Sequence, residues 1–231
     1  MHADITELDP VRLSTPSGVQ TNWHVITGGA CCGKTTLINL LAEQGFHTVP
    51  ETGRQVIEGE VAKGRAVEEV FRDGAMYARM IMDLQLRTEQ RLRATDLLFL
   101  DRALPGCLPF YRHFGLDVNK VLAECFRHRY ASVFILDLLP LELDGARIQD
   151  EAYTVHLDKA LVYYYGSLGY DVVRVPVLSP EERLEFVLER LSDQGLVSPL
   201  EYTESREGRQ AKDLSDMDID LTMAKKTQTT P

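Results

Sequence analysis

Short apolar runs alternate along the chain with longer stretches in which apolar positions recur at helical spacing. The runs predict strands over 23–26, 46–49, 97–100, 133–136 and 172–175. The stretches between them predict helices over 34–44, 53–63, 67–94, 118–129, 147–168 and 180–191. Nearly continuous apolar strands separated by helices are typical of a parallel sheet that is buried on both faces. The pattern therefore predicts an α/β fold with a five-stranded, mostly parallel sheet flanked by helices.

The same pattern divides the chain into three parts. Residues 1–20 are polar and lack periodicity, which predicts a flexible N-terminal arm. Residues 21–192 carry all the predicted strands and helices and form one predicted domain. The last predicted helix has a sharp start, because Ser179, Pro180 and Glu182 form a capping box with proline at the first helical position. Residues 193–231 are predicted to be an acidic, polar tail, with four aspartates in 213–220.

Composition and charge narrow the classes of function. The 231 residues are 44% hydrophobic, and the net charge is −10 with an isoelectric point near 5.1. Such acidity argues against non-specific binding to nucleic acid or to an anionic membrane. No apolar run approaches the roughly 20 residues that cross a bilayer, and residues 1–20 do not resemble a secretory signal. The expectation is a cytoplasmic protein whose four cysteines are reduced.

One segment, the phosphate loop, matches the G-x-x-x-x-G-K-[ST] motif at every position, between a predicted strand and a predicted helix. Its residues are Gly28, Gly29, Ala30, Cys31, Cys32, Gly33, Lys34 and Thr35. In such a loop the backbone N–H groups and the helix N-terminus surround the phosphates. Lys34 is expected to reach the β- and γ-phosphates, Thr35 to ligate Mg²⁺, and Thr36 to contact the α-phosphate. The chain is therefore expected to bind ATP with Mg²⁺.

A carboxylate ends another predicted strand, at Asp101, and Arg102 follows it. The carboxyl ends of parallel strands meet at one edge of a sheet, so Asp101 is expected near the phosphates, holding Mg²⁺ directly or through water. An N-cap role is its structural alternative. Motor ATPases usually place a second acid where this chain has Arg102. Arg102 is expected to bind the acceptor or its phosphate, with an ordinary surface ion pair as the alternative.

Two further segments supply candidate site residues. Glu51 follows the second predicted strand, where it can accept the proton of an attacking hydroxyl, or simply favour the dipole of the helix that follows. Arg54 on that helix is a candidate for acceptor binding. Arg147 lies on a turn that begins Asp144-Gly145, and it is expected to close over the triphosphate as part of a lid. Its alternative is a solvated arginine at a helix start.

Taken in order, these motifs resemble a known family. The residues that carry the resemblance are Gly28–Thr35, Glu51 with Arg54, Asp101-Arg102-Ala103-Leu104-Pro105, Asp144-Gly145-Ala146-Arg147 and Leu168-Gly169-Tyr170. They resemble a small P-loop AAA-type ATPase family, which is similar to the ribosylnicotinamide kinase domain of a bacterial NAD-biosynthesis regulator. The resemblance implies a nucleoside-kinase-like fold with Mg-ATP as donor. It also implies that Lys34, Thr35, Asp101 and Arg147 surround the phosphates.

The leading functional hypothesis is a Mg-ATP-dependent phosphotransferase, a small-molecule or nucleoside-type kinase that acts on a hydroxyl acceptor. Either Glu51 or Asp101 would take the proton. The alternative is a nucleotide-dependent switch module with slow hydrolysis and no small-molecule acceptor. A Ras-like GTPase is disfavoured, because Asn119-Lys120 is followed by Val121 rather than by the guanine-recognition pattern. The sequence names neither the acceptor nor the oligomeric state.

Overall fold

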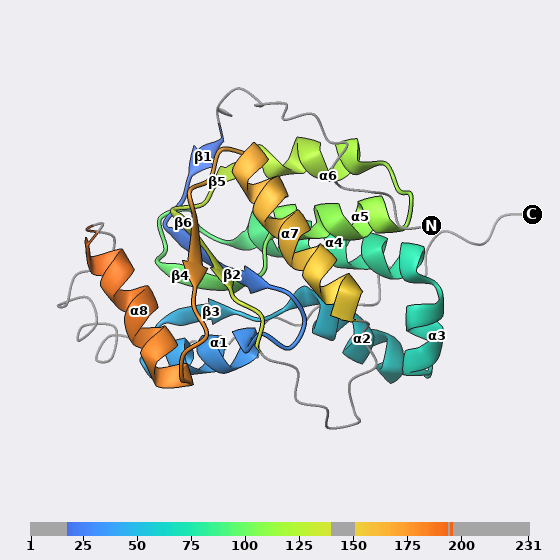
Figure 1. Ribbon diagram of the computed structural model, residues 1–231. Coiled ribbons are helices and arrows are strands. Elements are labelled where there is room, and N and C mark those ends of the chain that lie inside the picture. Colours follow the sequence, from blue (N-terminus) through green and yellow to red (C-terminus); the bar gives the residue numbers. More distant parts are fainter. Residues whose placement is uncertain (1–17, 140–150, 194, 196–231) are drawn as a thin grey trace, which may run out of the picture.

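The five predicted strands form one sheet in which every neighbouring pair is parallel (Figure 1). The structure is a computed structural model that describes residues 18–139, 151–193 and 195. The strand order is β3 (His47–Val49), β4 (Leu98–Asp101), β2 (Trp23–Gly28), β6 (Ser132–Leu136) and β7 (Val172–Val175). The predicted α/β fold with a five-stranded sheet is confirmed.

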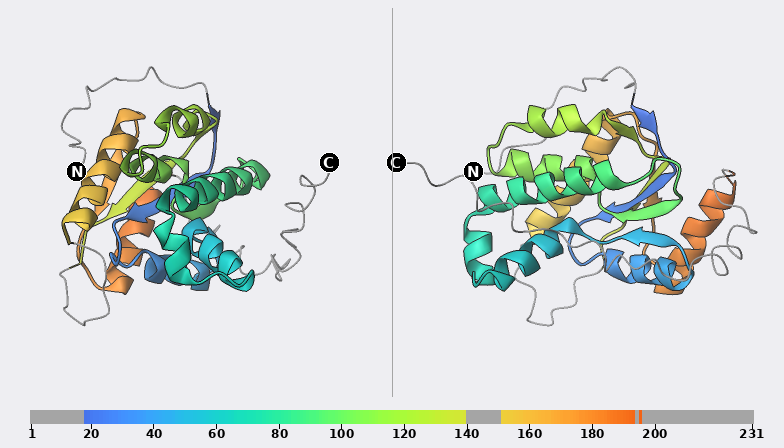
Figure 2. Two further views of the ribbon diagram at one scale, coloured as in Figure 1. Left: turned by 90° about the vertical axis from the view of Figure 1, so that its right-hand side faces the viewer. Right: turned by 180° about the vertical axis from the view of Figure 1, so that it is seen from behind.

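Helices cover both faces of this sheet (Figures 1 and 2). One face carries α1 (Lys34–Glu43) and α8 (Pro180–Asp193). The other carries α4 (Gly74–Arg91), α5 (Leu108–His113), α6 (Val118–Cys125) and α7 (Glu151–Ser167). The remaining helices are α2 (Thr52–Ala62), α3 (Val67–Arg72) and the short 3₁₀ helix η2 (Leu104–Cys107). Within the described residues no helix has the length and apolar character needed to span a membrane.

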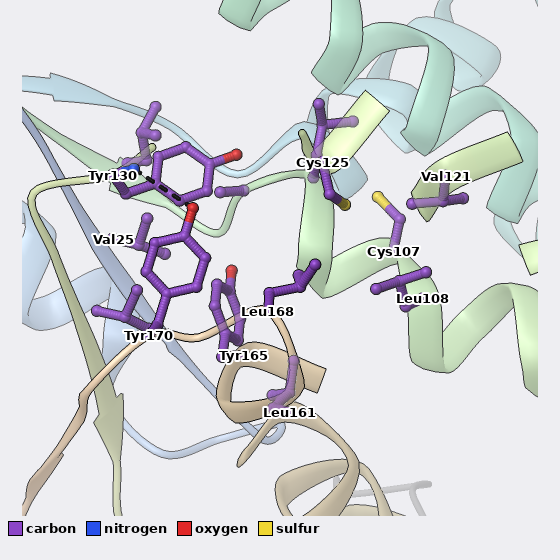
Figure 3. Close-up of a cluster of buried hydrophobic side chains, with 14 of the residues drawn as sticks. Val25, Cys107, Leu108, Val121, Cys125, Tyr130, Leu161, Tyr165, Leu168 and Tyr170 are labelled. Atoms are coloured by element: carbon purple, nitrogen blue, oxygen red, sulfur yellow. Dashed lines mark hydrogen bonds between the residues drawn. The ribbon is translucent and has the colours of Figure 1, made fainter. Parts of the chain in front are cut away.

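The core lies on both sides of the sheet because successive residues of a strand point to opposite faces. In β2, Val25 packs into the cluster under α4 to α7, whereas Ile26 packs into the cluster under α1 and α8. The larger cluster includes Tyr130, Tyr165 and Tyr170 (Figure 3). Full burial of an apolar side chain, such as Leu100 in this cluster or Phe134 in the other, contributes about 1.5–3 kcal/mol. The two clusters therefore hold the carboxyl ends of the strands in a fixed arrangement.

The predicted helix over 67–94 is wrong in one respect, because the structure divides it into α3 and α4. The Asp73 carboxylate accepts a hydrogen bond of 3.0 Å from the Met76 N–H and caps the second helix. A Cβ atom at Gly74 would lie 2.2 Å from the ring of Phe114, so glycine allows α4 to begin against that ring. The break thus comes from a long-range contact that helical periodicity does not record.

Two other boundaries differ from the predictions. The predicted helix over 118–129 ends at Cys125, and β5 (His128–Arg129) follows it. This strand pairs in parallel with β1 (Val19–Gln20), which lies inside the predicted arm 1–20.

The Ser179–Glu182 capping box forms as predicted, with its two N–H···O bonds at 2.9 and 3.3 Å. Arg147 and the predicted tail from 196 onward lie outside the described residues.

Candidate nucleotide and acceptor site

The phosphate loop joins the end of β2 to the start of α1, as the sequence predicts. Gly28 and Gly33 have φ angles of 149° and 87°, which L side chains rarely adopt. Gly33 is also the N-cap residue of α1, and because glycine has no side chain it cannot cap the first N–H groups of the helix. The first amides of a helix have no partner within the helix, so the loop and the helix start together present N–H donors to an anion.

Lys34 is buried in this loop, with 7% of its surface exposed. Its Nζ donates a hydrogen bond of 2.5 Å to the Gly29 carbonyl oxygen and lies 3.5 Å from Cys32 Sγ. Burial lowers the pKa of Lys34, and the nearby charge of Arg102 lowers that pKa further. A phosphate beside this ammonium would offset both effects. Thr35 and Thr36, the next residues of α1, have exposed side chains.

An arginine that the sequence analysis missed braces the phosphate loop from α8. Arg183 is 3% exposed, and its Nη1 donates a hydrogen bond of 2.6 Å to the Cys32 carbonyl oxygen. Its Nε donates one of 3.0 Å to the Pro176 carbonyl oxygen. The sequence signal is weak, because an arginine in the first turn of an amphipathic helix usually faces solvent. The two bonds tie the loop to α8 and to the segment that follows β7.

Asp101 lies at the end of β4, directly beside β2, and is 4% exposed. Burial, followed by the charge of Glu51, raises the pKa of Asp101 to about 6, although Lys34, Arg102 and Arg54 act in the opposite direction. Asp101 caps none of the described helices. Its Oδ1 has no hydrogen-bond partner among the described residues. This buried carboxylate oxygen is therefore available to a cation or to a water molecule.

Glu51 and Arg102 form an ion pair with a Glu51 Oε1 to Arg102 Nε distance of 2.9 Å. The side chains are 28% and 15% exposed, so this is not the ordinary surface pair considered above. Glu51 is the N-cap residue of α2, but its side chain makes no capping bond. Arg54 is exposed on α2, within electrostatic reach of Asp101. The fold thus brings Lys34 and these predicted residues to one place.

A cavity of about 240 Å³ opens beside this cluster. Its lining includes Ala30 of the phosphate loop together with Glu51 and Arg102. Aromatic rings line much of the rest: Phe71, Tyr77, Phe110, Phe114 and Tyr153. Because these rings come from α3, α4, α5, α7 and the turn after α5, no local pattern in the sequence indicated them. The cavity can enclose an organic molecule whose polar end meets the charged cluster.

The residues present fit Mg²⁺ bound together with a nucleotide. The described residues contain no group of three His, Cys, Asp or Glu side chains that could hold a metal by themselves. Mg²⁺ usually binds through one or two protein oxygens together with water and substrate phosphates. The unpartnered Asp101 oxygen and the Thr35 hydroxyl are oxygen donors of this kind. Both belong to elements that meet at the phosphate loop.

Comparison with known proteins adds a family and a fold. Residues 23–183 match the profile of an AAA domain family, whereas no curated protein matches the chain. A crystal structure of NadR protein in complex with NR is 20% identical, with a TM-score of 0.57, over 77% of this chain and 52% of that one. NadR protein in complex with NAD and AMP-PNP gives 19% identity and a TM-score of 0.54, over 77% and 50%. The chain thus spans about half the length of these proteins, and the likeness shows the shared fold.

Proposed function

The chain belongs to this AAA domain family, and from that premise we propose that it is a Mg-ATP-dependent phosphotransferase. Its acceptor would be a hydroxyl group of a small molecule, as in nucleoside-type kinases. The observation that carries the proposal is the cavity, whose lining combines Ala30, Glu51 and Arg102 with aromatic rings. Hydrolysis alone needs room only for water, whereas an aromatic-lined cavity suits an organic acceptor.

In this proposal the phosphate loop binds the triphosphate of ATP. Lys34 would bind the β- and γ-phosphates and Thr36 the α-phosphate, while Thr35 and Asp101 would hold Mg²⁺. When bound, Mg²⁺ neutralises charge on the phosphate oxygens. Arg147, outside the described residues, is proposed to close over the triphosphate. Pre-positioned cations of this kind stabilise the charge that spreads over the γ-phosphoryl oxygens in the transition state.

Glu51 is the better candidate for the base, because it lines the cavity while Asp101 is not among the lining residues. Its carboxylate would accept the proton of the acceptor hydroxyl as that oxygen bonds to the γ-phosphorus. The bond from that phosphorus to the β-phosphate oxygen breaks, and ADP leaves. Arg102 would orient the hydroxyl, and the exposed Arg54 would contact the acceptor at the mouth of the site.

The test is acceptor-dependent release of ADP from Mg-ATP over a panel of nucleosides, sugars and polyols. We expect one chemical class to raise the rate at least about 10-fold over hydrolysis without acceptor, and ³¹P NMR to show a phosphate monoester. The Glu51→Gln variant should lose most of this stimulation while still binding ATP. A panel without any active acceptor would contradict the proposal, and a strong GTP preference with slow hydrolysis would favour the switch.

Filling the cavity should block the acceptor but leave the nucleotide unaffected. A Cβ atom at Gly106 would have only Arg102 Cβ near it, at 3.9 Å, so a Gly106→Leu side chain has room to enter the cavity. We expect the acceptor KM to rise at least about 10-fold while the Kd for Mg-ATP changes less than about 2-fold. Gly166→Leu, at an exposed glycine of α7, is the matched control. Equal effects of both variants would show that the cavity does not bind the acceptor.

A further inference from the structure

A buried carboxyl group lies behind the cavity, and the mechanism proposed above does not use it. Glu89 on α4 is 0% exposed. Its Oε1 accepts hydrogen bonds of 2.9 Å from both Gln85 Nε2 and the Leu104 N–H. Its Oε2 accepts one of 2.8 Å from the Tyr130 hydroxyl, and His128 Nδ1 lies 3.8 Å away. Burying a carboxyl group is costly unless hydrogen-bond donors satisfy its oxygens. Here three donors do so.

One branch of this network leads to the Glu51 side of the site. The Thr52 hydroxyl donates a hydrogen bond of 2.9 Å to Gln85 Oε1. Thr52 and Gln85 are each 2% exposed, so water does not compete for the hydrogen bond between them. Since Thr52 directly follows Glu51, this bond holds the start of α2 against α4. Both polar atoms of the Gln85 amide are used, one toward Thr52 and one toward Glu89.

The other branch leads to Arg102, whose backbone is strained. Arg102 has a φ angle of 71°, which is rare for a residue with a side chain. Its N–H donates to the Ile26 carbonyl oxygen at 3.0 Å, and two residues later the Leu104 N–H donates to Glu89. A strained conformation persists only where its surroundings over-determine it. The bond made by Arg102 itself and the one made two residues later by Leu104 supply that restraint.

The two branches form a closed circuit together with the ion pair between Glu51 and Arg102. We infer that Thr52, Gln85 and Glu89 are positioning residues that set the separation and orientation of that ion pair. They would act on the acceptor hydroxyl only through Glu51 and Arg102. Displacements of about 1 Å in such groups can change rates by about 100-fold, so the circuit would govern phosphoryl transfer more than nucleotide binding. This inference rests on the proposed function.

The most direct kinetic test compares Thr52→Val with Thr52→Ser. Valine keeps the shape of threonine and removes the hydroxyl, whereas serine keeps the hydroxyl. We expect the valine variant to lower kcat for acceptor phosphorylation by about 10- to 100-fold, with the Kd for Mg-ATP within about 2-fold of the unmodified chain. Serine should restore kcat to within about 3-fold. Parallel losses of kcat and ATP affinity, or equal losses in both variants, would overturn the inference.

A second readout does not depend on finding an acceptor. Crystal structures of the unmodified chain, Thr52→Val and Gln85→Met should show the Glu51–Arg102 pair at 2.9 Å in the first and separated beyond 4.0 Å in the variants. A pair that is retained in both variants would refute the positioning role. If no acceptor is phosphorylated but the pair opens as expected, the proposed phosphotransferase activity fails while the structural circuit stands.

Discussion

Lys34→Ala is expected to weaken Mg-ATP binding by at least about 100-fold and to abolish measurable turnover. The reason is geometric and electrostatic. Lys34 is a buried cation within the phosphate loop, where low exposure strengthens its attraction for phosphate oxygens. No other lysine among the described residues belongs to this loop, so no neighbouring ammonium can take its place.

The same substitution should leave the folded state as stable as before, or more stable. Burial lowers the pKa of Lys34, so its side chain binds a proton less readily in the folded chain than in the unfolded chain. The charged lysine therefore costs stability in the folded state, and alanine removes that cost. Isothermal titration of Mg-ATP and thermal unfolding would measure both effects. Lys120→Ala on the exposed face of α6 is the matched control. Retained ATP affinity in Lys34→Ala would remove the basis for a nucleotide site.

Asp101→Asn should raise stability and lower activity together. The pKa of Asp101 is raised from 3.8 to about 6 in the folded chain, chiefly by burial. Since its pKa is higher in the folded chain than in the unfolded one, the stability that this group contributes is present below about pH 4 and is lost as pH rises through about 6. At neutral pH the ionised carboxylate costs up to about 3 kcal/mol, which asparagine avoids.

Urea unfolding at two pH values would test the sign of this effect. The variant should exceed the unmodified chain in stability near neutral pH, and the difference should vanish below about pH 4. Turnover with Mg-ATP should fall at least about 100-fold in the variant, because a neutral amide holds Mg²⁺ poorly. In the unmodified chain kcat/KM for Mg-ATP should decline as pH falls below about 6, because in the free chain the protonated Asp101 binds Mg²⁺ poorly. A variant that is less stable at neutral pH would contradict the role of burial.

Much of the fold and part of the site could be predicted from local patterns. Continuous apolar runs predict the strands, because nearly every position of a strand that is buried on both faces is apolar. The phosphate loop can be recognised because its glycines and Lys34 act within eight consecutive residues. Glu51 and Asp101 each follow a strand, and parallel strands end at the same edge of their sheet. The structure brings both carboxylates and Lys34 together, while their chemical roles remain proposals.

Other features depend on contacts between distant parts of the chain. The break before Gly74 exists because the ring of Phe114, forty residues later, lies against that backbone. Arg183 is separated from Cys32 by 151 residues, and in the sequence it looks like an ordinary arginine of an amphipathic helix. Glu89 likewise looks like a solvent-exposed helix residue. Hydrophobic periodicity cannot reveal such buried polar residues, because it records average exposure and not the partners that make burial tolerable.

The sequence by itself determined that this chain is an α/β protein with a loop suited to phosphate, because backbone geometry and strand burial act over short distances. Tertiary structure alone decided where the aromatic cavity lies, how Arg183 braces the loop and how Glu89 links both sides of the Glu51–Arg102 pair. The cavity and the Glu89 contacts arise where α4, α5 and α7 pack on one face of the sheet, whereas Arg183 reaches the loop from α8 on the other face. Packing selects side-chain partners across the whole chain, and that selection has no local signal.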